Sequence, residues 1–483
     1  MSDVNQVHLE KLESLPEGWA ETTVSKIVQM ISTNKKKLAQ KNYLDKGDFP
    51  VVDQGQEFIA GYSNNEALII HGEPPFIVFG DHTRAFKFAN FNFVPGADGV
   101  KVMKSLEVDP KWCFYIFQAI KLPNKGYARH FQYLKEAYLP VPPPEQQKRI
   151  VAKIEELFSH IDAGIEALKK AKQLLKQYRQ SVLKAAVTGE LTKEWREANK
   201  DDAQGSANVA GGRTPGAATK EETAQELLER ILKERRQKWV EQQLEQFKAK
   251  GKMLKNDKWK DKYVAPESYD EKPPFELPTE WIWVYLGQLG EVIGGLTKNK
   301  KREQFELQLP YLRVANVYAN ELRLDDVTMI GVQESELERV LLEKGDLLVV
   351  EGNGSPEQIG RLAIWDGSIE PCVHQNHLIK VRLQEKNSGN YLMYWLSSLG
   401  GRDAILQVAS STSGLYTLSI SKVSGLPIPL PPIKEQVKIH NIVSLKLSSI
   451  EYLENEINDQ LLKAERNKQS ILASAFSGNL NQG

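Results

Sequence analysis

The sequence predicts an α+β fold in which two mixed α/β domains are separated by two long antiparallel coiled-coil helices, with a pseudo-two-fold internal repeat. Three observations lead to this prediction. A helix ending written "QSVLKAAVTGEL" at 180–191 returns as "QSILASAFSGNL" at 469–480. A proline-rich entry, "LPVPPPEQ" at 139–146, returns as "LPIPLPPIKEQ" at 426–436. Between each entry and ending, apolar residues recur every seven positions, the pattern of a coiled coil.

The two globular segments repeat one another as well. After a tail at 1–14, we expect a first domain at 15–144 and a second at 277–434. Each domain opens on a similar motif, "LPEGW" or "LPTEW", and carries a basic cluster about 20 residues later. Each also contains a strand-like run, "GVKVMK" or "LIKVRL", followed by an aromatic-rich helical stretch, "WCFYIFQAI" or "YLMYWLSSL".

The long helices are expected at 145–192 and 435–483. Apolar residues seven apart mark the seam of the first helix: Ile154, Ile161, Leu168, Leu175 and Val182. The same positions 289 residues later are Val443, Ile450, Ile457, Ala464 and Ile471. Gly189 and Gly478 are the expected stops. Two similar helices that pair across a two-fold axis must run antiparallel, and each would be roughly 65 Å long at ~1.5 Å per residue.

A different kind of segment, 193–276, connects the two halves. Its Gly-rich, small and polar stretch at 198–220 predicts a flexible linker. Thr219 and Glu222 have the spacing of a capping box ahead of the charged helical run "AQELLERILKERRQKWVEQQLEQFKAKG". Because the apolar stripe of this helix is narrow (Leu228, Ile231 and Leu232), a solvated linker helix is favoured over a dedicated docking helix.

Composition excludes several classes of protein. The chain holds 63 basic and 63 acidic residues, so a uniformly basic nucleic-acid coat is excluded, while local basic faces are not. The sequence shows no run of 18 apolar residues and no signal-like segment, and Cys113 and Cys372 are its only cysteines. A soluble, cytoplasmic protein without a membrane partner is therefore expected.

Sequence signals for catalysis or metal binding are weak. "GEPPF" at 72–76 resembles a methyltransferase motif but has Glu at its first position, and there is no glycine-rich cofactor loop ahead of it. "HQNH" at 374–377 lacks an evident third metal ligand, so a polar groove or loop is favoured over a metal site. No phosphate-binding loop with GxxxxGK[ST] spacing occurs. We therefore predict no catalytic residue, no metal and no cofactor bound by this chain.

Two similar domains held apart by a rigid spacer match a ligand with the same symmetry. Duplex DNA with two half-sites at a fixed separation is such a ligand. Because the domains are similar but not identical, the two half-sites should differ in sequence.

The repeated proline entry, the repeated "QSxLxxAxxGxL" ending and the tract "RQSVLKAAVTGELTKEWR" at 179–196 make the chain resemble the specificity subunit of type I restriction-modification systems. The resemblance covers nearly the whole chain except the segment at about 198–276. It implies a non-catalytic subunit with two target-recognition domains, each reading one half of an asymmetric bipartite DNA site. It also implies two adenine-methyltransferase subunits that dock on the long helices and motor-nuclease subunits that join for restriction. S-adenosylmethionine, ATP and Mg²⁺ would be bound by those partner subunits.

Base edges are read by amide and guanidinium groups presented on loops, whereas lysines more often hold phosphates. The predicted base readers are Arg84, Arg129, Arg313, Asn316, Asn353 and Gln375. Further candidate DNA contacts are Gln54, Gln56, His82, Thr83, Tyr127, Ser355, Thr412 and Tyr416, with phosphate contacts at Lys35, Lys36 and Lys300. Candidate partner contacts are the seam residues Ile154, Ile161, Leu168, Leu175, Ile450, Ile457 and Ile471.

Two alternatives stay open. A self-sufficient DNA methyltransferase would bind S-adenosylmethionine as an isolated chain. A coiled-coil scaffold without a DNA role would show no change of sequence specificity when its recognition domains are exchanged.

Overall fold

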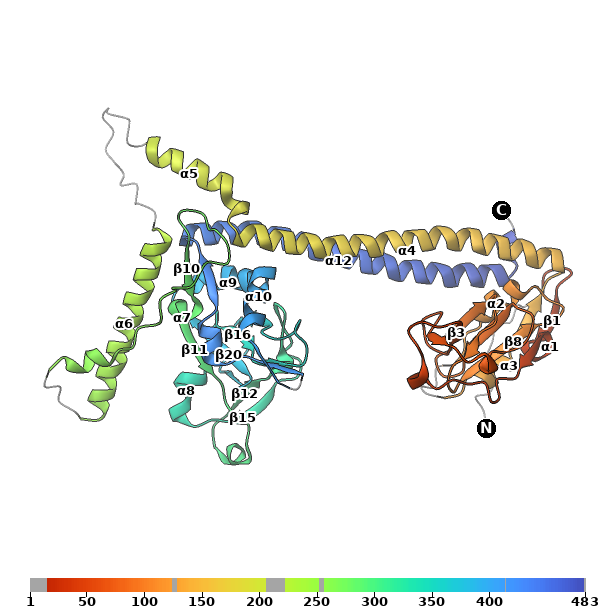
Figure 1. Cartoon of the computed structure of the whole chain (residues 1–483), viewed down its shortest axis with the longest axis horizontal. Helices are drawn as coiled ribbons and strands as arrows, with labels where there is room; N and C mark the ends of the chain where they lie inside the picture. The colour runs from red at the N-terminus through yellow and green to blue at the C-terminus, as the bar shows by residue number, and fades with distance from the viewer. Residues whose placement is uncertain (1–14, 124–127, 206–221, 252–255, 413, 482–483) are drawn as a thin grey trace. The chain divides into compact units, whose positions relative to one another are not determined.

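The computed structural model describes residues 15–123, 128–205, 222–251, 256–412 and 414–481 (Figure 1). The predicted tail at 1–14 lies outside them. The chain divides into two compact units, Met1–Lys172 with Asn455–Gly483, and Gln173–Glu454. Each long helix contributes one part to each unit. Within the described ranges, no helix has the length and apolar character that a membrane span requires.

The first domain is built on a four-stranded antiparallel sheet in the order β2-β8-β5-β6. A smaller sheet, β4-β3-β7, pairs β3 antiparallel with β4 and parallel with β7, and β1 pairs with β9. The strands are β1 (Ala20–Thr23), β2 (Val28–Ile31), β3 (Phe49–Val52), β4 (Gly61–Ser63), β5 (Phe76–Gly80), β6 (Phe86–Ala89), β7 (Val94–Pro95), β8 (Val100–Ser105) and β9 (Tyr138–Val141). The helices are α1 (Val24–Ile27), α2 (Pro110–Ala119) and α3 (Phe131–Lys135).

The second domain repeats this topology with insertions. Its four-stranded sheet has the order β11-β20-β16-β18, and β12 pairs antiparallel with β15 and parallel with β19. The repeated strands are β10 (Ile282–Tyr285), β11 (Gly290–Gly294), β12 (Gln308–Leu312), β15 (Thr328–Gly331), β16 (Leu347–Val350), β18 (Leu362–Ile364), β19 (Val373–His374), β20 (Leu378–Leu383) and β23 (Pro427–Leu430). The helices are α7 (Leu286–Leu289), α8 (Glu334–Val340), α9 (Gly389–Ser397), α10 (Leu399–Val408) and α11 (Ile420–Ser424).

Five further strands belong to the second domain alone. These are β13 (Val317–Tyr318) with β14 (Glu321–Leu322), and β17 (Gly352–Asn353), which pairs with β22 (Leu415–Thr417) and through it with β21 (Ser410–Thr412). Apart from these insertions, strand order and strand direction agree between the domains, so the predicted internal repeat is confirmed.

The helix α2 shows how local sequence places the core of the first domain. Asp109 caps the helix by accepting hydrogen bonds from the amides of Lys111 and Trp112, and Pro110 occupies the first turn, where its missing N–H costs nothing. The helix then buries Trp112 and Cys113 against the four-stranded sheet. Burial raises the pKa of the Cys113 thiol and raises that of Cys372 to about 12, so neither thiol is activated.

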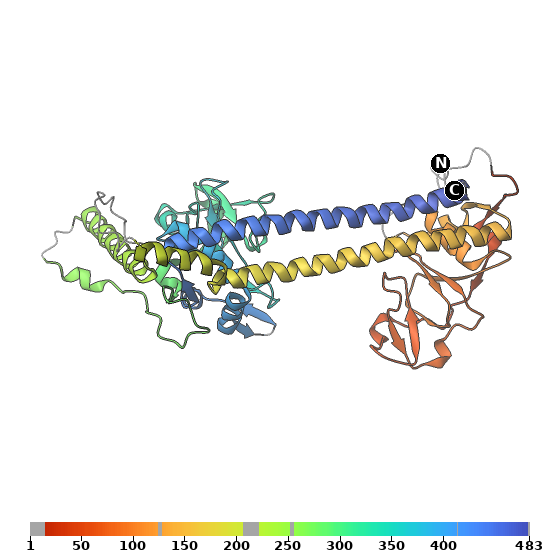
Figure 2. The same ribbon diagram turned by 90° about the horizontal axis from the view of Figure 1, so that it is seen from above.

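The two long helices are α4 (Pro144–Val187) and α12 (Ile433–Phe476), each 44 residues long. In the first unit, Lys468 pairs with Asp162, and Lys172 Nζ donates to Asn458 Oδ1 at 2.8 Å. In the second unit, Arg179 Nη2 lies 3.0 Å from Glu454 Oε2. Positions that rise along α4 meet positions that fall along α12, so the helices are antiparallel, as predicted (Figure 2).

The C-terminal end of each long helix belongs to a domain core. In the second unit, the last turns of α4 bury Val182, Leu183 and Ala186 in the core of the second domain. In the first unit, the last turns of α12 bury Leu472 and Phe476 in the core of the first domain, where the Phe476 ring meets Trp112 edge-to-face at 6.1 Å. Each helix therefore leads out of one domain and ends in the core of the other.

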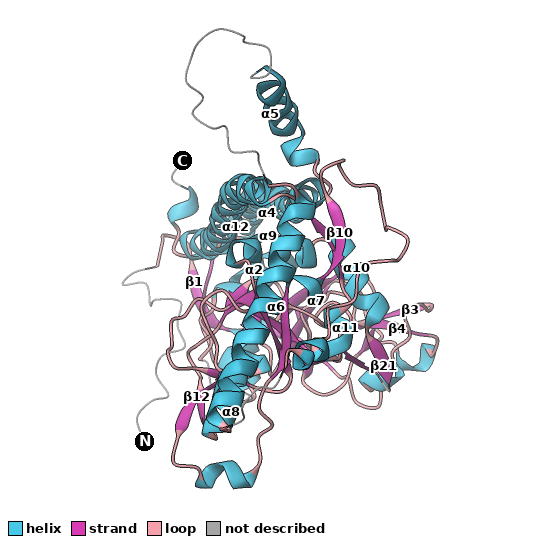
Figure 3. Ribbon diagram, turned by 90° about the vertical axis from the view of Figure 1, so that its left-hand side faces the viewer, coloured by secondary structure: helices cyan, strands magenta, loops and turns pink. Residues whose placement is uncertain are grey.

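The connecting segment differs from its prediction. The expected linker at 198–220 begins inside the helix α5 (Lys193–Gly205), and 206–221 lies outside the described residues. The capping box of the charged helix α6 (Ala224–Ala249) is formed by Thr223 and Glu226, four residues beyond the predicted pair. The prediction of a solvated helix is wrong for the N-terminal half of α6, where Leu227, Leu228 and Ile231 are buried in the core of the second domain. The helix α6 lies against α7 of that domain (Figure 3).

Candidate nucleic-acid interface

The candidate DNA contacts of the second domain lie at five places, after β11, β12, β16 and β19 and ahead of α11. The first domain has its candidates at four of the equivalent places, after β2, β3 and β5 and ahead of α3, whereas its loop after β7 carries none. A parallel bridge joins two of the loops in each domain, between Leu38 and Gly96 and between Leu296 and Gln375. The topology therefore gathers residues that are far apart in the sequence into equivalent sets of loops.

In the first domain, three predicted residues meet in one cluster. Thr83 Oγ1 donates to the carbonyl oxygen of Gln54 at 2.6 Å, and the amide of His82 donates to Gln54 Oε1 at 3.4 Å. Gly99 has a left-handed backbone (φ 91°), which favours glycine, and a Cβ at this position would lie 2.6 Å from Gln54 Oε1. Thr83 is exposed, and Gln54 and His82 are half-buried, so the cluster presents polar groups at the surface on a fixed backbone.

The loop ahead of α3 is fastened to the turn that carries His82 and Thr83. His130, which is fully buried, places Nδ1 3.0 Å from the carbonyl oxygen of Asp81, and Asp81 Oδ1 accepts from the amide of Phe131 at 2.7 Å. The supporting role of these two residues was not predicted from the sequence, because hydrogen bonding between loops depends on their conformation.

The remaining candidates of the first domain are spread around this cluster. Arg84 has a left-handed backbone (φ 62°) and directs Nη1 to the carbonyl oxygen of Leu122 at 3.5 Å. Gln56, Arg129 and Lys35 are exposed. Lys36 Nζ donates to the carbonyl oxygen of Ile69 at 2.5 Å, so its ammonium is already used inside the domain. Tyr127 lies outside the described residues.

In the second domain, the loop after β12 corrects one prediction. Asn316 is buried, its Oδ1 accepts from the amide of Arg313 at 2.8 Å, and its Nδ2 donates to the carbonyl oxygens of Arg323 and Asp326. Both N–H groups of this amide and one of its two oxygen lone pairs are therefore occupied inside the loop. Asn316 thus shapes the loop and has no N–H group left for a base. Gln375 Oε1 accepts from the amide of Val314 at 3.3 Å, which brings the loop after β19 to the same place.

Arg313 is held by an acidic neighbour. Its Nη2 lies 2.7 Å from Asp326 Oδ2, and Asp326 is 83% exposed while Arg313 is 31% exposed. The guanidinium therefore stays accessible but has a fixed direction, which suits a group that must meet a base edge.

A second group of candidates lies on the β17-β22-β21 ribbon. Asn353 pairs with Tyr416 across β17 and β22, and Thr412 lies opposite Leu415 on β21 and β22. Asn353 Oδ1 accepts from the amide of Ser355 at 2.9 Å. His377 Nδ1, 2.7 Å from Glu351 Oε2, connects this ribbon with the loop after β19. A narrow β-ribbon is one of the elements that fit the DNA major groove.

One cluster of the second domain was not predicted. The Arg323 guanidinium lies 3.8 Å from the centre of the Tyr318 ring, and that of Arg361 lies 4.9 Å from it. Arg361 also donates to the carbonyl oxygens of Val314 and Val317, so it links the loop after β16 with the loop after β12. Because Arg361 lies 38 positions beyond Arg323, no local sequence pattern joins the three residues. The predicted phosphate contact Lys300 is exposed on η5 (Lys300–Gln304).

The histidines of "HQNH" take structural positions. His374 is fully buried on β19, and its Nδ1 lies 2.8 Å from the carbonyl oxygen of Leu378, whereas His377 is exposed and bonded to Glu351. Within the described parts of the chain, no three His, Cys, Asp or Glu side chains are grouped closely enough to hold a metal ion.

Acid is expected to weaken the second domain through His374. Burial lowers the pKa of this imidazole to about 3, whereas the unfolded chain takes up the proton near its ordinary pKa of 6.5. The contribution of neutral His374 to the stability of the folded domain is thus present above pH 6.5 and is lost as the pH falls toward 3. Between pH 6.5 and 5 the free energy of unfolding should fall by about 1.5 kcal/mol more in the wild type than in His374→Gln. Urea unfolding at the two pH values measures the difference. Equal losses of unfolding free energy in the wild type and in His374→Gln would show that another group dominates the pH dependence. His71 is exposed, so His71→Gln is the control that removes an imidazole which is not buried.

The burial of residues between the long helices contradicts part of the predicted partner contacts. Ile154, Ile450 and Ile457 are buried within the chain itself, so they cannot meet a partner in this conformation. The other predicted members are half-buried in the same seam: Ile161, Leu168, Leu175 and Ile471. The large apolar side chains that α4 and α12 expose lie elsewhere: Leu174, Tyr178, Val437, Leu445, Tyr452, Leu453 and Leu462.

Comparison with known proteins adds the following similarities. Residues 16–175 and 278–463 match the model of the family described as "Type I restriction modification DNA specificity domain". Over 347 residues the chain is 27% identical to the EcoKI specificity subunit of Escherichia coli K12, covering 71% of this chain and 57% of that protein. It is 23% identical to the StySPI specificity subunit of Salmonella potsdam, covering 96% and 90%. A chain from a solved structure of a type I R-M system has a similar fold, with a TM-score of 0.59, 16% identity and coverage of 96% and 99%.

Proposed function

The chain belongs to the family of type I restriction-modification DNA specificity domains, and on that premise we propose that it is the non-catalytic specificity subunit of a modification and restriction complex. Each domain reads one half of an asymmetric bipartite site in double-stranded DNA. The antiparallel helices set the spacing between the halves, and two adenine-methyltransferase subunits dock on them.

The observation that carries this proposal is the repetition of one topology with different loop residues. Both domains present loops from equivalent places, but the residues differ: the first offers Gln54 where the second offers Arg313, and His82 and Thr83 where the second offers Asn353. Gln375 of the second domain stands where the first has Gly96. Equivalent loops with different donors and acceptors suit two different base sequences read in the same manner.

The exposed part of the helix pair supports the docking of partner subunits. Leu445 and Tyr452 are seven residues apart on α12 and are 72% and 65% exposed. Such side chains next to a buried seam are the usual contacts of an added helix. We therefore place the methyltransferase contact on these residues and on Leu174 and Tyr178, instead of on the seam. The motor-nuclease subunits would join this assembly, and S-adenosylmethionine, ATP and Mg²⁺ would be bound by the partners.

Co-expression with its methyltransferase tests the proposal. We expect sequencing of modified adenines to give a bipartite motif with one methylated adenine in each half. Gln54→Ala with Thr83→Ala should relax only the first half-site, and Asn353→Ala with Gln375→Ala only the second. Each lost pair of base contacts should reduce discrimination by about 1–3 kcal/mol.

The double variants serve as controls for each other, since each leaves the opposite half-site intact. Relaxation of both halves by one double variant would contradict independent reading. The isolated chain is expected neither to bind S-adenosylmethionine nor to methylate DNA, and either activity would favour the self-sufficient methyltransferase instead.

A further inference from the structure

The helix α6 and the segment that follows it form an arm whose two ends have different roles. We define the arm as residues 236–251 and 256–263, which comprise the C-terminal half of α6 and the 3-10 helix η4 (Lys258–Lys262). The N-terminal half of α6, residues 224–235, is the anchor that fixes the arm to the second domain.

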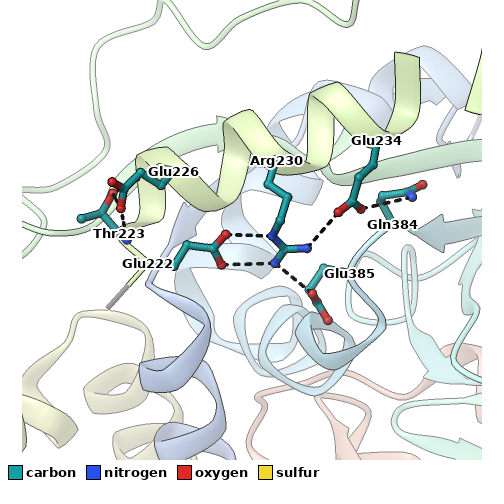
Figure 4. A network of polar contacts seen from close by, with 7 residues as sticks. All are labelled: Glu222, Thr223, Glu226, Arg230, Glu234, Gln384 and Glu385. Carbon is teal, nitrogen blue, oxygen red and sulfur yellow. Dashed lines mark hydrogen bonds and ion pairs between the residues drawn. The ribbon is translucent and has the colours of Figure 1, made fainter. Parts of the chain in front are cut away.

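The anchor uses its arginines for attachment. Figure 4 shows the Arg230 guanidinium enclosed by three carboxylates, with Nε 2.7 Å from Glu222 Oε1 and Nη2 3.1 Å from Glu385 Oε2. Glu385 belongs to the second domain, so this contact ties α6 to it. The carboxylates raise the pKa of Arg230, which stays charged. Arg235 donates to the carbonyl oxygens of Gly287 and Gly290. Both arginines are thus consumed by the attachment.

The arm has a small aromatic core of its own. The rings of Trp239 and Trp259 stack at 5.9 Å, Tyr263 lies 5.4 Å from Trp239, and Phe247 meets Trp259 edge-to-face at 5.5 Å. These contacts fold the segment after α6 back onto the helix. The arm therefore has a defined shape rather than only a helical end.

The surface of the arm is rich in lysines. Its described residues from 248 to 262 include five lysines and two aspartates, in a chain with no net charge. Lys260 pairs with Asp257 at 3.2 Å. Among the described residues, no carboxylate lies within ion-pair distance of Lys248, Lys250, Lys258 or Lys262, and all four are exposed. Unlike the anchor, the arm has cationic groups left over for a polyanion.

A chain of contacts connects the arm with the lysines predicted to hold phosphate in the second domain. Gln242 of α6 donates to Glu338 of α8 at 3.2 Å, and Glu336 of α8 pairs with Arg302 of η5 at 2.8 Å. Lys300 lies on the same 3-10 helix η5. The helix α8 therefore contacts both the arm and the 3-10 helix that carries Lys300, the predicted phosphate contact.

From these contacts we propose that the arm binds the phosphate backbone of duplex DNA flanking the second half-site, without regard to its sequence. The proposal rests on the proposed function for the presence of a duplex at the second domain. Unpaired lysines on a fixed support supply the charge that phosphates need, and they carry no base specificity. An acidic protein surface would also attract these lysines, but the neighbouring phosphate-binding loop favours DNA.

The experiment measures binding of the full chain to a fluorescently labelled duplex of arbitrary sequence over a series of salt concentrations. The variant combines Lys248→Gln, Lys250→Gln, Lys258→Gln and Lys262→Gln. Each lost phosphate contact lowers the slope of log K against log salt by about 0.9, so two to four contacts should lower it by about 2–4. The affinity at low salt should fall by at least tenfold.

Two controls isolate the arm. Replacing four exposed lysines of α4 by glutamine removes the same charge elsewhere and should leave both quantities nearly unchanged: Lys153, Lys169, Lys170 and Lys176. Replacing the four arm lysines by arginine keeps the charge and should retain binding, which excludes misfolding of the arm as the cause of a loss.

The outcomes separate this proposal from the proposed function. A normal bipartite methylation motif together with a lowered salt slope supports both. An unchanged salt slope in the glutamine variant overturns the arm proposal, whatever the methylation motif. Unchanged DNA binding with lost binding of the co-expressed methyltransferase would also overturn it, in favour of a protein contact. A lowered slope without any methylation motif would support the arm and contradict the proposed function.

Discussion

Replacing Glu435 with alanine is expected to lower the free energy of unfolding of the second unit by about 3–5 kcal/mol, because it leaves a largely buried guanidinium without its partner. Glu435 is fully buried at the start of α12, where Oε1 accepts from Thr192 Oγ1 at 2.6 Å and pairs with Arg196. Its Oε2 accepts from Trp281 Nε1 at 2.8 Å. One carboxylate thus joins the beginning of α12, the residues after α4 and the opening of the second domain.

The internal repeat supplies a matched control for this prediction. Gln146 occupies the same place at the start of α4, and its Oε1 accepts from Trp19 Nε1 at 2.8 Å. Gln146→Ala removes one neutral hydrogen bond and should cost about 1 kcal/mol. Urea unfolding followed by tryptophan fluorescence measures both variants. Similar losses at the two sites would contradict a dominant role for the ion pair. Glu435→Ala combined with Arg196→Met should recover part of the loss, because no charge is then left buried.

The sequence was most informative where its pattern was both local and repeated. The heptads from Ile154 to Val182 predicted the long helix α4, since seven-residue spacing alone determines which face of a helix is buried. The proline entries predicted the starts of both long helices, because proline is tolerated in the first turn of a helix but not in its interior. Antiparallel pairing followed from the symmetry of the repeat.

The connecting segment shows where local patterns are insufficient. Thr219 and Glu222 have the spacing of a capping box, but Thr223 and Glu226 share this spacing and form the box in the structure. The narrow stripe of Leu228 and Ile231 looked too small for docking. Burial of this stripe depends on the fit of α6 to the second domain and on Glu385, which is 155 positions from Arg230. No pattern within α6 could reveal that partner.

In the candidate site, too, the sequence predicted some residues correctly and others wrongly. Residue type and loop position predicted Gln54, His82 and Thr83, which the structure brings together. Asn316 has the right chemistry for reading adenine, but its amide is consumed by backbone groups of its own loop. Hydrogen-bond satisfaction depends on loop conformation, which a single sequence does not specify. The distinction between a reader and a support therefore requires coordinates.

Lengthening both long helices is expected to change the spacing of the DNA motif without changing either half-site. We propose inserting four residues after Lys172 in α4 and four before Asn458 in α12, because these two residues face each other and pairing beyond them is kept. Four residues add ~6 Å to a helix, which corresponds to about two base pairs at roughly 34–36 Å per 10–10.5 base pairs. The prediction rests on the proposed role of the helices as the spacer.

Rotation limits how far the spacing can move. Four residues turn a helix by about 40° beyond one full turn, and two base pairs turn a duplex by about 70°. Because these rotations differ, the preferred spacer should lengthen by about one to two base pairs, with partial loss of methylation. Sequencing of modified adenines from cells that express the original and the lengthened chains measures the shift. Altered half-sites at the original spacing would contradict a spacer role, since they would mean that the helices influence base reading directly.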